Sequence, residues 1–488
     1  MEGEATIPRH KTALSRTDLS RPLRGLLTDG LLAPGRTIMD YGCGRGGDTR
    51  RLRALGYDCV GWDPVHAPDG PRRPSDVVNL GYVVNVIERP VERVEALRAA
   101  WGLARQLLVV SARLVDEQAP GGSVVTYADG LVTRIGTFQK FYEHAELKTW
   151  IDQALEVQSV AAAPGVFYAF RDPAERSSFL ASRFRRVAAQ PRLHAHEAAY
   201  ASHRPLLDAL AAFVAERGRL PERDELREYS DLEAALGSVS RAYRVLERVS
   251  GDQSWNAVRE ARSQDLLVFL GLSRFEGKHS LGALATAMQH DIKAFFGSFA
   301  EATRRANDLL FSLGRADERD AACRASPVGK AMPEALYVHL SALGELPPLL
   351  RLYEGCARTL TGTVPGANIV KLGLSAPKIS YLSYPAFESD PHPSLASSTS
   401  IDLQTFRIRE RSYVDRKNPP LLHRKEQFVS ASHPSREKYA RLTRLEEQKG
   451  LYENPASIGT REGWTAALRG KRLALRGHRL VAATGPEA

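Results

Sequence analysis

Residues suited to binding an adenosine-type cofactor are closely spaced between Thr37 and Asp63. An apolar run ends in Asp40, a glycine-rich turn follows, and a helical segment then leads to a second apolar run that ends in Asp63. Glycines at a strand-to-helix turn let the backbone approach a ligand where a Cβ would collide. An acid about 20 residues further on is placed to accept hydrogen bonds from ribose hydroxyls. This order of residues predicts a site for an adenosine-type cofactor.

The identity of the cofactor depends on Asp40. Gly42, Gly44 and Gly47 also satisfy the dinucleotide pattern GxGxxG, but a carboxylate two residues before the first glycine would repel a pyrophosphate. The same carboxylate suits the cationic end of S-adenosylmethionine (SAM), reached directly or through water. A dinucleotide site and a turn that binds nothing remain the alternatives. The predicted SAM-binding residues are Asp40, Gly42, Cys43, Gly44, Gly46 and Asp63.

The motif DxGxGxG, formed by Asp40, Gly42, Gly44 and Gly46, resembles the first motif of the class I SAM-dependent methyltransferases. Asp63 falls where that family has its ribose-binding acid. The resemblance implies a Rossmann-like α/β fold for residues 1–172. The Pro-rich connector after Asp63 is too short for the further strand and helix of many such enzymes, and Asp76 is a weak substitute for their adenine contact.

Further strands are expected after this connector. Residues 75–88 are predicted to form a buried parallel strand, and residues 106–114 a second one. Residues 165–170 are predicted to form an antiparallel strand that closes the sheet. Ligands of open α/β sheets bind at the carboxyl ends of the strands. Asn79 and Tyr82 are therefore the candidates to face the methyl acceptor. They match the first and fourth positions of the [DN]PP[YF] motif of amino-directed methyltransferases, but both prolines are missing; a generic strand end is the alternative.

The net charge of +10 is unevenly distributed. Residues 1–172 contain 21 Lys and Arg against 21 Asp and Glu, and the rest of the chain contains 46 against 36. A basic attachment to a neutral catalytic candidate suits a polyanionic partner. Solvated helix faces explain the same excess without any partner.

Residues 173–320 are predicted to form a helical region. In the segment 216–248 we expect a helix to end at Gly218, a new helix to start at Pro221, and an arginine-rich helix to follow Gly237. Arg241, Arg244 and Arg248 share one face of that helix, where they would contact phosphates or simply face solvent.

Residues 321–488 are predicted to form a mixed α/β or α+β region. Its densest basic stretch runs from Arg407 to Lys425, and within it we expect Arg424 and Lys425 to contact nucleic acid. Asp390, His392, His423 and Glu426 match no standard metal-ligand spacing, so no metal is predicted.

The four cysteines form no CxxC pair, which argues against a zinc site and a disulfide framework. No apolar run approaches 18 residues, and the N-terminus lacks the apolar core of a signal peptide. We therefore expect a cytoplasmic protein without a membrane span.

Segments along nearly the whole chain resemble the bacterial methyltransferase family associated with DNA phosphorothioation. They include HKTALSRTDLSRP, MDYGCGRGGD, DVVNLGYVVNVIERPVERVEAL, GTFQKFYEHAEL, FYAFRD, PKISYLSYP and NPPLLHRKE. The resemblance implies a SAM-dependent methyltransferase in the setting of DNA sulfur modification, acting on or at DNA and with other proteins of that system as partners. Two alternatives stay open: a SAM-binding regulatory or DNA-binding subunit without methyl transfer, and a small-molecule or protein methyltransferase.

Overall fold

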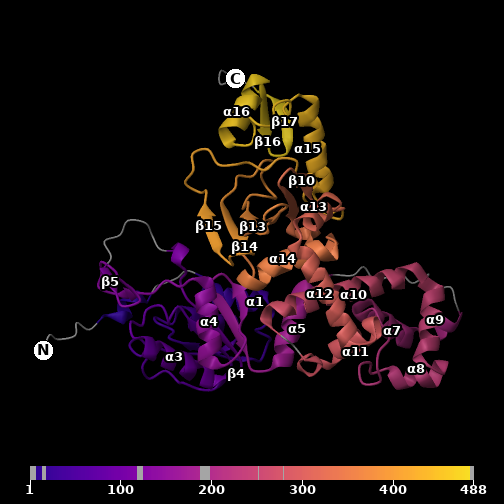
Figure 1. Cartoon of the computed structure of the whole chain (residues 1–488), viewed down its shortest axis with the longest axis horizontal. Coiled ribbons are helices and arrows are strands. Elements are labelled where there is room, and N and C mark those ends of the chain that lie inside the picture. The colour runs from indigo at the N-terminus through magenta and orange to yellow at the C-terminus, as the bar shows by residue number, and fades with distance from the viewer. Residues whose placement is uncertain are drawn as a thin grey trace.

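The computed structural model describes residues 7–13, 18–117, 125–186, 198–250, 252–277 and 280–483. Its N-terminal region is built on a six-stranded sheet in the order β2-β1-β3-β4-β9-β8 (Figure 1). Strands β1 to β4 run parallel, and β9 is antiparallel to both of its neighbours. The strands are β1 (Thr37–Tyr41), β2 (Asp58–Trp62), β3 (Ser75–Gly81), β4 (Ala104–Ser111), β8 (Val160–Ala163) and β9 (Val166–Phe170).

This sheet confirms the predicted Rossmann-like α/β fold with its closing antiparallel strand. As the short connector predicted, residues 63–74 form turns and one isolated bridge in place of a further strand and helix. Asp76 lies at the amino end of β3, where its carboxylate accepts hydrogen bonds from Thr37 N and Oγ1, both at 2.8 Å. Asp76 therefore ties two strand starts together, at the edge of the sheet opposite the glycine turn.

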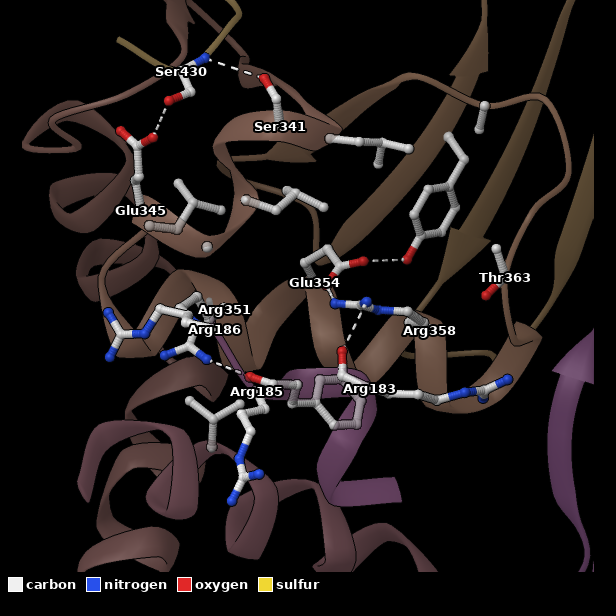
Figure 2. A pocket seen from close by; sticks show the side chains of 18 of the residues that line it. Arg183, Arg185, Arg186, Ser341, Glu345, Arg351, Glu354, Arg358, Thr363 and Ser430 are labelled. Atoms are coloured by element: carbon white, nitrogen blue, oxygen red, sulfur yellow. Dashed lines mark hydrogen bonds and ion pairs between the residues drawn. The ribbon is translucent and has the colours of Figure 1, made fainter. Parts of the chain in front are cut away.

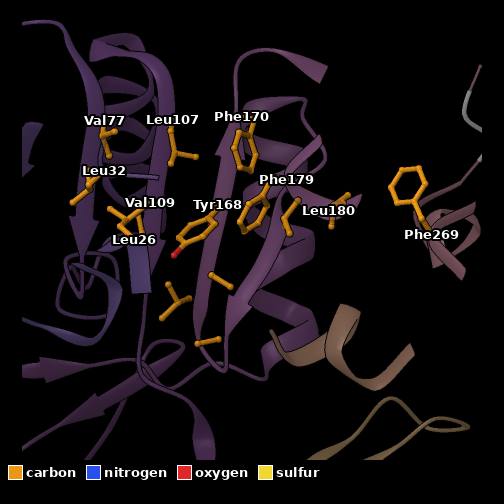
Figure 3. Packing of buried hydrophobic residues seen from close by; sticks show 14 of the residues in the cluster. Leu26, Leu32, Val77, Leu107, Val109, Tyr168, Phe170, Phe179, Leu180 and Phe269 are labelled. Atoms are coloured by element: carbon orange, nitrogen blue, oxygen red, sulfur yellow. The ribbon is translucent and has the colours of Figure 1, made fainter. Parts of the chain in front are cut away.

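Each strand contributes side chains to two cores, one on each face of the sheet, because successive residues of a strand point to opposite faces. Ile38, Val77 and Leu107 belong to one core, and Met39 and Val78 belong to the other. Helices α1, α2 and α5 cover the first face, and α3 and α4 cover the second. Figure 3 shows Val77, Leu107 and Tyr168 of the first core with Phe179 and Leu180 of α5. The helices are α1 (Arg21–Thr28), α2 (Gly47–Ala54), α3 (Pro90–Leu103), α4 (His144–Leu155) and α5 (Pro173–Phe184).

Three short strands form a separate small sheet in the order β5-β6-β7. They are β5 (Val125–Tyr127), β6 (Gly130–Val132) and β7 (Phe138–Gln139). Asp129, in the turn between β5 and β6, receives hydrogen bonds from Arg93 and Lys140. These bonds lower the pKa of Asp129 to about 2, that of Arg93 contributing most.

The middle of the chain is helical, as predicted. The helices after α5 are α6 (Ala198–Ser202), α7 (Arg204–Arg217), α8 (Tyr229–Leu236), α9 (Val239–Ser250), α10 (Asp252–Ser273), α11 (Thr286–Phe296), α12 (Phe299–Gly314) and α13 (Ala316–Arg324). Helix α7 ends at Gly218 as expected, but the predicted helix at Pro221 is wrong, because the next one starts at Tyr229. Glu225 explains the difference: its carboxylate accepts from Glu222 N and from buried Arg219, which holds the segment as a turn.

Helix α10 connects two hydrophobic cores. Leu266 and Phe269 pack in the core under the N-terminal sheet, whereas Val268 and Leu272 pack in the core of the C-terminal region. Helices α6 to α9 form a third, smaller core with Trp255 at the start of α10, at the right of Figure 1.

The C-terminal region contains a six-stranded antiparallel sheet in the order β10-β11-β12-β13-β14-β15. Its strands are β10 (Lys330–Met332), β11 (Ala335–His339), β12 (Ile369–Gly373), β13 (Lys378–Ser383), β14 (Ser397–Asp402) and β15 (Ile408–Ser412). Helix α14 (Pro348–Thr361) packs against this sheet, and α15 (Arg436–Gln448), α16 (Arg461–Gly470), β16 (Leu473–Arg476) and β17 (Arg479–Ala482) follow. The region is therefore α+β.

Element types change near both predicted domain boundaries, at 172 between β9 and α5 and just after 320, where α13 ends at Arg324. The division into three domains stays a prediction. None of the helices that the structure describes combines the length and apolar character that a membrane span requires.

Candidate functional site

The glycine turn lies at the carboxyl edge of the N-terminal sheet, between the end of β1 and the start of α2. Gly42, Gly44 and Gly46 have φ angles of 82°, 51° and 69°, which residues with a Cβ rarely adopt. A Cβ on Gly42 would lie 2.3 Å from Val83 Cγ2. The turn therefore requires glycine at position 42 for both its backbone conformation and its space.

Asp63 follows β2 directly and faces the same turn. Its Oδ2 accepts a hydrogen bond from Gly44 N at 3.0 Å, and its Oδ1 accepts from Val65 N at 3.0 Å and His66 N at 2.8 Å. Three backbone N–H groups thus fix the carboxylate. A carboxylate oxygen has more than one lone pair, so Asp63 keeps acceptor capacity toward the cavity that it lines.

A cavity of about 430 Å³ opens in front of the turn. Its wall includes the predicted residues Gly42, Cys43, Gly44, Asp63 and Tyr82. Residues that the sequence analysis did not identify complete the wall, among them Arg9, Trp62, Asn85, Glu92, Glu95 and Gln139. A volume of this size fits a small-molecule or cofactor site.

Asp40 and Asn79 lie beneath the turn and are not part of the cavity wall. Both are buried, and Asn79 Nδ2 donates a hydrogen bond to Asp40 Oδ1 at 2.8 Å. Thr49 Oγ1 of α2 donates to Asp40 Oδ2 at 3.5 Å. This placement corrects the expectation for Asn79, because its amide supports Asp40 instead of facing the acceptor. It also places the Asp40 carboxylate under the backbone of the turn.

Tyr82 lines the cavity in a strained backbone conformation. Its φ of 59° is left-handed, which is costly for a bulky residue and often found at functional sites. Tyr82 N donates to Ser111 O at 2.9 Å and to Ser111 Oγ at 3.2 Å, which holds the turn after β3 against the end of β4. These bonds keep Tyr82 at the carboxyl edge of the sheet, where the sequence predicted an acceptor contact.

A pair of amides forms another part of the wall. Asn85 Nδ2 donates to Gln139 Oε1 at 3.0 Å, which joins the segment after β3 to β7. The signal for Asn85 in the sequence is one polar residue inside the apolar run VVNVIE. No pattern distinguishes Gln139, because it reaches the cavity only through tertiary folding.

A short N-terminal segment closes one side of the cavity. Arg9, in the helical turn η1 (Arg9–Thr12), donates to both Glu88 carboxylate oxygens at 2.7 Å and to Glu92 Oε2 at 2.7 Å. The pKa of Arg9 is raised because of its bonds to Glu92 and then Glu88. Residues before the first strand therefore form part of the cavity wall.

Cys43 in the turn carries no nucleophilic thiolate at neutral pH. Burial, and after it the Asp40 carboxylate, raise the pKa of its thiol to about 12. Its contribution to the cavity is therefore shape and apolar contact.

The predicted nucleic-acid residues fall in two different environments. Arg241, Arg244 and Arg248 lie exposed on α9. Lys425, in contrast, is buried at 2% exposure, and its Nζ donates to Phe387 O at 2.6 Å and to Asp390 O at 2.7 Å. The assignment of Lys425 to phosphate is therefore corrected, because its ammonium group does not reach the surface.

Arg424 is partly buried beside Lys425. Its Nη1 lies 2.7 Å from Glu447 Oε1, and its guanidinium lies 4.3 Å from the centre of the Tyr452 ring. A phosphate would have to compete with both contacts.

A more accessible basic surface lies on the edge strand β15 and the segment after it. In the described part of the chain, no hydrogen bond or ion pair involves the side chains of Arg407, Arg409, Arg411 or Lys417, and all four residues are exposed. Glu410 N donates to Asp116 Oδ2 at 3.2 Å, which ties β15 to the segment after β4. The basic strand is thus attached at the edge of the N-terminal sheet that also carries the cavity.

The histidines of the C-terminal region form a packed cluster. His392 Nε2 lies 2.7 Å from buried Glu446 Oε1, and the His392 and His423 rings are 4.5 Å apart. Among the residues that the structure describes, no group of three or more His, Cys, Asp or Glu side chains is arranged to hold a metal ion.

Comparison with protein-family models and with curated proteins gives no match. Solved structures with a similar fold are methyltransferases. A 1,6-didemethyltoxoflavin N1-methyltransferase from Burkholderia thailandensis, with bound S-adenosylhomocysteine, is 18% identical and covers 31% of this chain and 76% of its own, with a TM-score of 0.24. A SAM-bound amino pentose methyltransferase of calicheamicin biosynthesis from Micromonospora echinaspora is 15% identical. The match covers 31% of this chain and 92% of that protein, with a TM-score of 0.24. A magnesium protoporphyrin IX methyltransferase from Synechocystis is 14% identical. The match covers 34% of this chain and 93% of that protein, with a TM-score of 0.22.

Proposed function

We propose that this protein is a SAM-dependent methyltransferase that acts on or at DNA, in the setting of DNA phosphorothioate modification. The observation that carries the proposal is that the glycine turn and the Asp63 carboxylate face one cavity at the carboxyl ends of β1, β2 and β3. Ligands of open α/β sheets bind at this edge.

The residues of the cavity fit SAM better than a dinucleotide. The wall holds three carboxylates, from Asp63, Glu92 and Glu95, against two guanidinium groups, from Arg9 and Arg113, so acidic groups are in excess. A cationic sulfonium is attracted by such a wall, whereas a pyrophosphate is repelled. The glycines admit the ligand, and Asp63 accepts from the ribose hydroxyls. SAM, when bound, supplies an electrophilic methyl group.

Methyl transfer from a sulfonium demands little acid chemistry, so this chain mainly has to position donor and acceptor. Tyr82 is proposed to contact the acceptor, because its strained backbone holds it in the cavity wall at the end of β3. Asp40, Asn79 and Thr49 act from below by fixing the base of the glycine turn.

The basic strand β15 supports DNA as the partner. Arg409 and Arg411 alternate with Glu410 along the strand, so both lie on one face. Phosphate contacts of this kind fix the position of a duplex without reading its sequence. The link to phosphorothioation rests on the sequence resemblance described above.

The second candidate is a SAM-binding regulatory or DNA-binding subunit that transfers no methyl group. The observation in its favour is the position of Asn79, whose amide bonds Asp40 and does not line the cavity, so the first position of the [DN]PP[YF]-like segment presents no acceptor contact. Such a subunit would bind SAM and DNA and show no turnover.

The test is transfer of labelled methyl from SAM to DNA, with phosphorothioated and unmodified duplexes compared. We expect label on DNA. It should be reduced in Asp63→Asn because SAM binds more weakly, and reduced in Tyr82→Ala with SAM binding retained. Label on neither duplex, with SAM binding intact, would favour the regulatory subunit. Transfer to a small molecule or a protein in the same assay would replace DNA as the acceptor.

A further inference from the structure

A second, larger cavity lies away from the glycine turn, where the helical and C-terminal regions meet the end of α5 (Figure 2). Its volume is about 710 Å³. Its walls come from the end of α5, from α10, from the helical turn η5 (Leu340–Glu345), from α14 and from the segment around Ser430. Segments far apart in sequence thus enclose one space, to which Tyr381 of β13 also contributes.

Arginines dominate the polar part of this wall. They are Arg183, Arg185, Arg186, Arg351 and Arg358. Three guanidinium groups share the single carboxylate of Asp265: Arg186 Nε at 2.7 Å, Arg351 Nη2 at 2.8 Å, and Arg262 Nη1 at 3.2 Å from behind the wall. One carboxylate cannot neutralise three cations, so positive charge is left in excess beside the cavity.

The buried arginines also retain unused donors. Arg351 has a side chain only 6% exposed, and its Nη1 has no hydrogen-bond partner. Burial lowers the pKa of Arg351 in spite of Asp265, because the guanidinium has lost water that the carboxylate does not replace. A buried donor without a partner is costly, and an anion in the cavity would stabilise the charged wall electrostatically without bonding this atom directly.

Arg183 is paired with Asp29, Arg185 with Glu216 and Arg358 with Glu354, so the excess positive charge comes from the three arginines that share Asp265. Glu354 is 2% exposed and accepts from Arg358 Nη2 at 2.5 Å and from the Tyr381 hydroxyl at 2.9 Å. Glu345 lies at the exposed rim and accepts from Ser430 Oγ. Figure 2 shows Ser341, Glu345 and Ser430 on one side of the space, and Arg351 and Arg358 on the other.

We propose that this cavity binds a phosphate ester that carries a flat aromatic ring, as a nucleoside phosphate does. The planar guanidinium fork matches phosphate oxygens better than other cationic side chains do. The remaining wall is apolar, with Phe184, Val268, Leu343 and Val364 placed to contact a ring. The volume lies within the range of small-molecule sites. The same chemistry is present in a free nucleotide and at the phosphorylated end of an oligonucleotide.

Gly344 offers a test that leaves the buried arginines intact. It is exposed in η5, and an added Cβ would lie 3.5 Å from Arg186 Cγ, an ordinary contact. Gly344→Glu therefore places a carboxylate beside the arginines, and Gly344→Gln is its neutral control of the same size. Isothermal titration calorimetry on the full chain would use pyrophosphate, ATP and adenosine as probes.

We expect saturable binding of ATP, weaker binding of pyrophosphate and weakest binding of adenosine. Gly344→Glu should weaken ATP binding at least tenfold, and Gly344→Gln by less than threefold. Titration with an oligonucleotide, with and without a 5′-phosphate, distinguishes a nucleic-acid end from a free nucleotide as the source.

Three results would overturn the proposal. The first is no saturable heat with any probe at millimolar concentration. The second is equal ATP binding by Gly344→Glu and Gly344→Gln. The third is loss of ATP binding in Asp63→Asn, since that result would place the nucleotide in the cavity at the glycine turn. These readouts involve no methyl transfer and therefore stand apart from the test of the proposed function.

Discussion

The N-terminal and C-terminal regions both gather polar side chains, but they use them differently. At the glycine turn, the fixed carboxylate of Asp63 lines a cavity of about 430 Å³. In the C-terminal region, Glu446 is fully buried, and its carboxylate is occupied by His392 at 2.7 Å and the Tyr452 hydroxyl at 2.8 Å. Trp464 packs against His392, with ring centres 4.5 Å apart, and fills the adjacent space.

The difference teaches that proximity of histidines and acids does not make a site. The parallel strands of the N-terminal sheet end at one edge and leave open space there, so polar groups at that edge stay available. The C-terminal cluster lies packed between aromatic rings, where Glu446 is paired with His392 and Tyr452. His392 Nδ1, His423 Nδ1 and Trp464 Nε1 are buried there without a partner among the described residues and without open space beside them. Burial lowers the pKa of His423 to about 3, as expected for a histidine kept neutral in a packed interior.

The strongest test of this contrast is Glu446→Ala. It leaves His392 and Tyr452 without their acceptor in a packed interior, so we expect a loss of about 3–5 kcal/mol in the free energy of unfolding. Glu447→Ala, one residue along α15, removes a partly exposed pair with Arg424 and should cost less than about 1 kcal/mol. Urea denaturation measures both. If Glu446→Ala lost SAM binding at unchanged stability, Glu446 would belong to a binding site and not to a structural cluster.

Asp63→Asn tests the other side of the contrast. We expect SAM affinity to fall by about 1–3 kcal/mol, because charge-assisted hydrogen bonds are lost while the side-chain volume is kept. The matched control is Asp58→Asn, at the exposed start of the same strand, which should leave affinity unchanged. Calorimetric titration with SAM gives both values, and equal affinity in the two variants would remove the ribose assignment.

His144 joins the N-terminal and C-terminal regions and makes the free energy of unfolding depend on pH. Its Nδ1 accepts from Gly165 N at 3.0 Å, and its Nε2 donates to Leu360 O of α14 at 2.5 Å. Burial lowers the pKa of His144 from 6.5 to about 4, so the unfolded chain takes up the proton first as the pH falls. Stability is therefore lost between pH 6.5 and 4, by at most about 1.4 kcal/mol per pH unit.

In His144→Gln this contribution to the pH dependence is absent. The difference in unfolding free energy between the wild type and this variant should shrink from pH 7 to pH 4. Urea denaturation at four pH values in this range measures it. A constant difference would mean that His144 does not titrate in this window.

The smallest expected effect concerns the basic strand. Arg409→Ala/Arg411→Ala should lower DNA affinity and reduce the slope of log affinity against log salt by about 2, one for each phosphate contact. Arg304→Ala/Arg305→Ala is the matched control, because those exposed arginines are already paired with Glu301. Fluorescence anisotropy at several salt concentrations measures the slopes. Equal slopes in the two double variants would exclude β15 as the contact.

The main strands of the N-terminal sheet and the glycine turn follow from local signals in the sequence. Apolar runs, glycines and the two acids Asp40 and Asp63 occur within about 30 residues, so their spacing fixes which strand ends meet. The missing strand after β2 is equally local, because the connector is short. For the same reason the mixed character of residues 321–488 and the shared helix face of Arg241, Arg244 and Arg248 were predicted.

The roles of Asn79 and Lys425 could not be predicted in this way. Asn79 turns toward Asp40 because β1 and β3 are neighbours in register, with Asp40 opposite Asn79. Lys425 is buried by Phe387 and Tyr439, which lie about 40 and 14 residues away in sequence. Arg9 reaches the cavity through Glu88 and Glu92, a pairing that no periodicity indicates.

The shared helix α10 also has a consequence for synthesis of the chain. The core under the N-terminal sheet includes Phe269 of α10 and Ala302 and Ala306 of α12, all made long after the last strand of that sheet, β9. A nascent chain arrested just after β9 therefore exposes one face of its sheet. We expect it to remain sensitive to protease, and to become resistant only when α12 has left the ribosome.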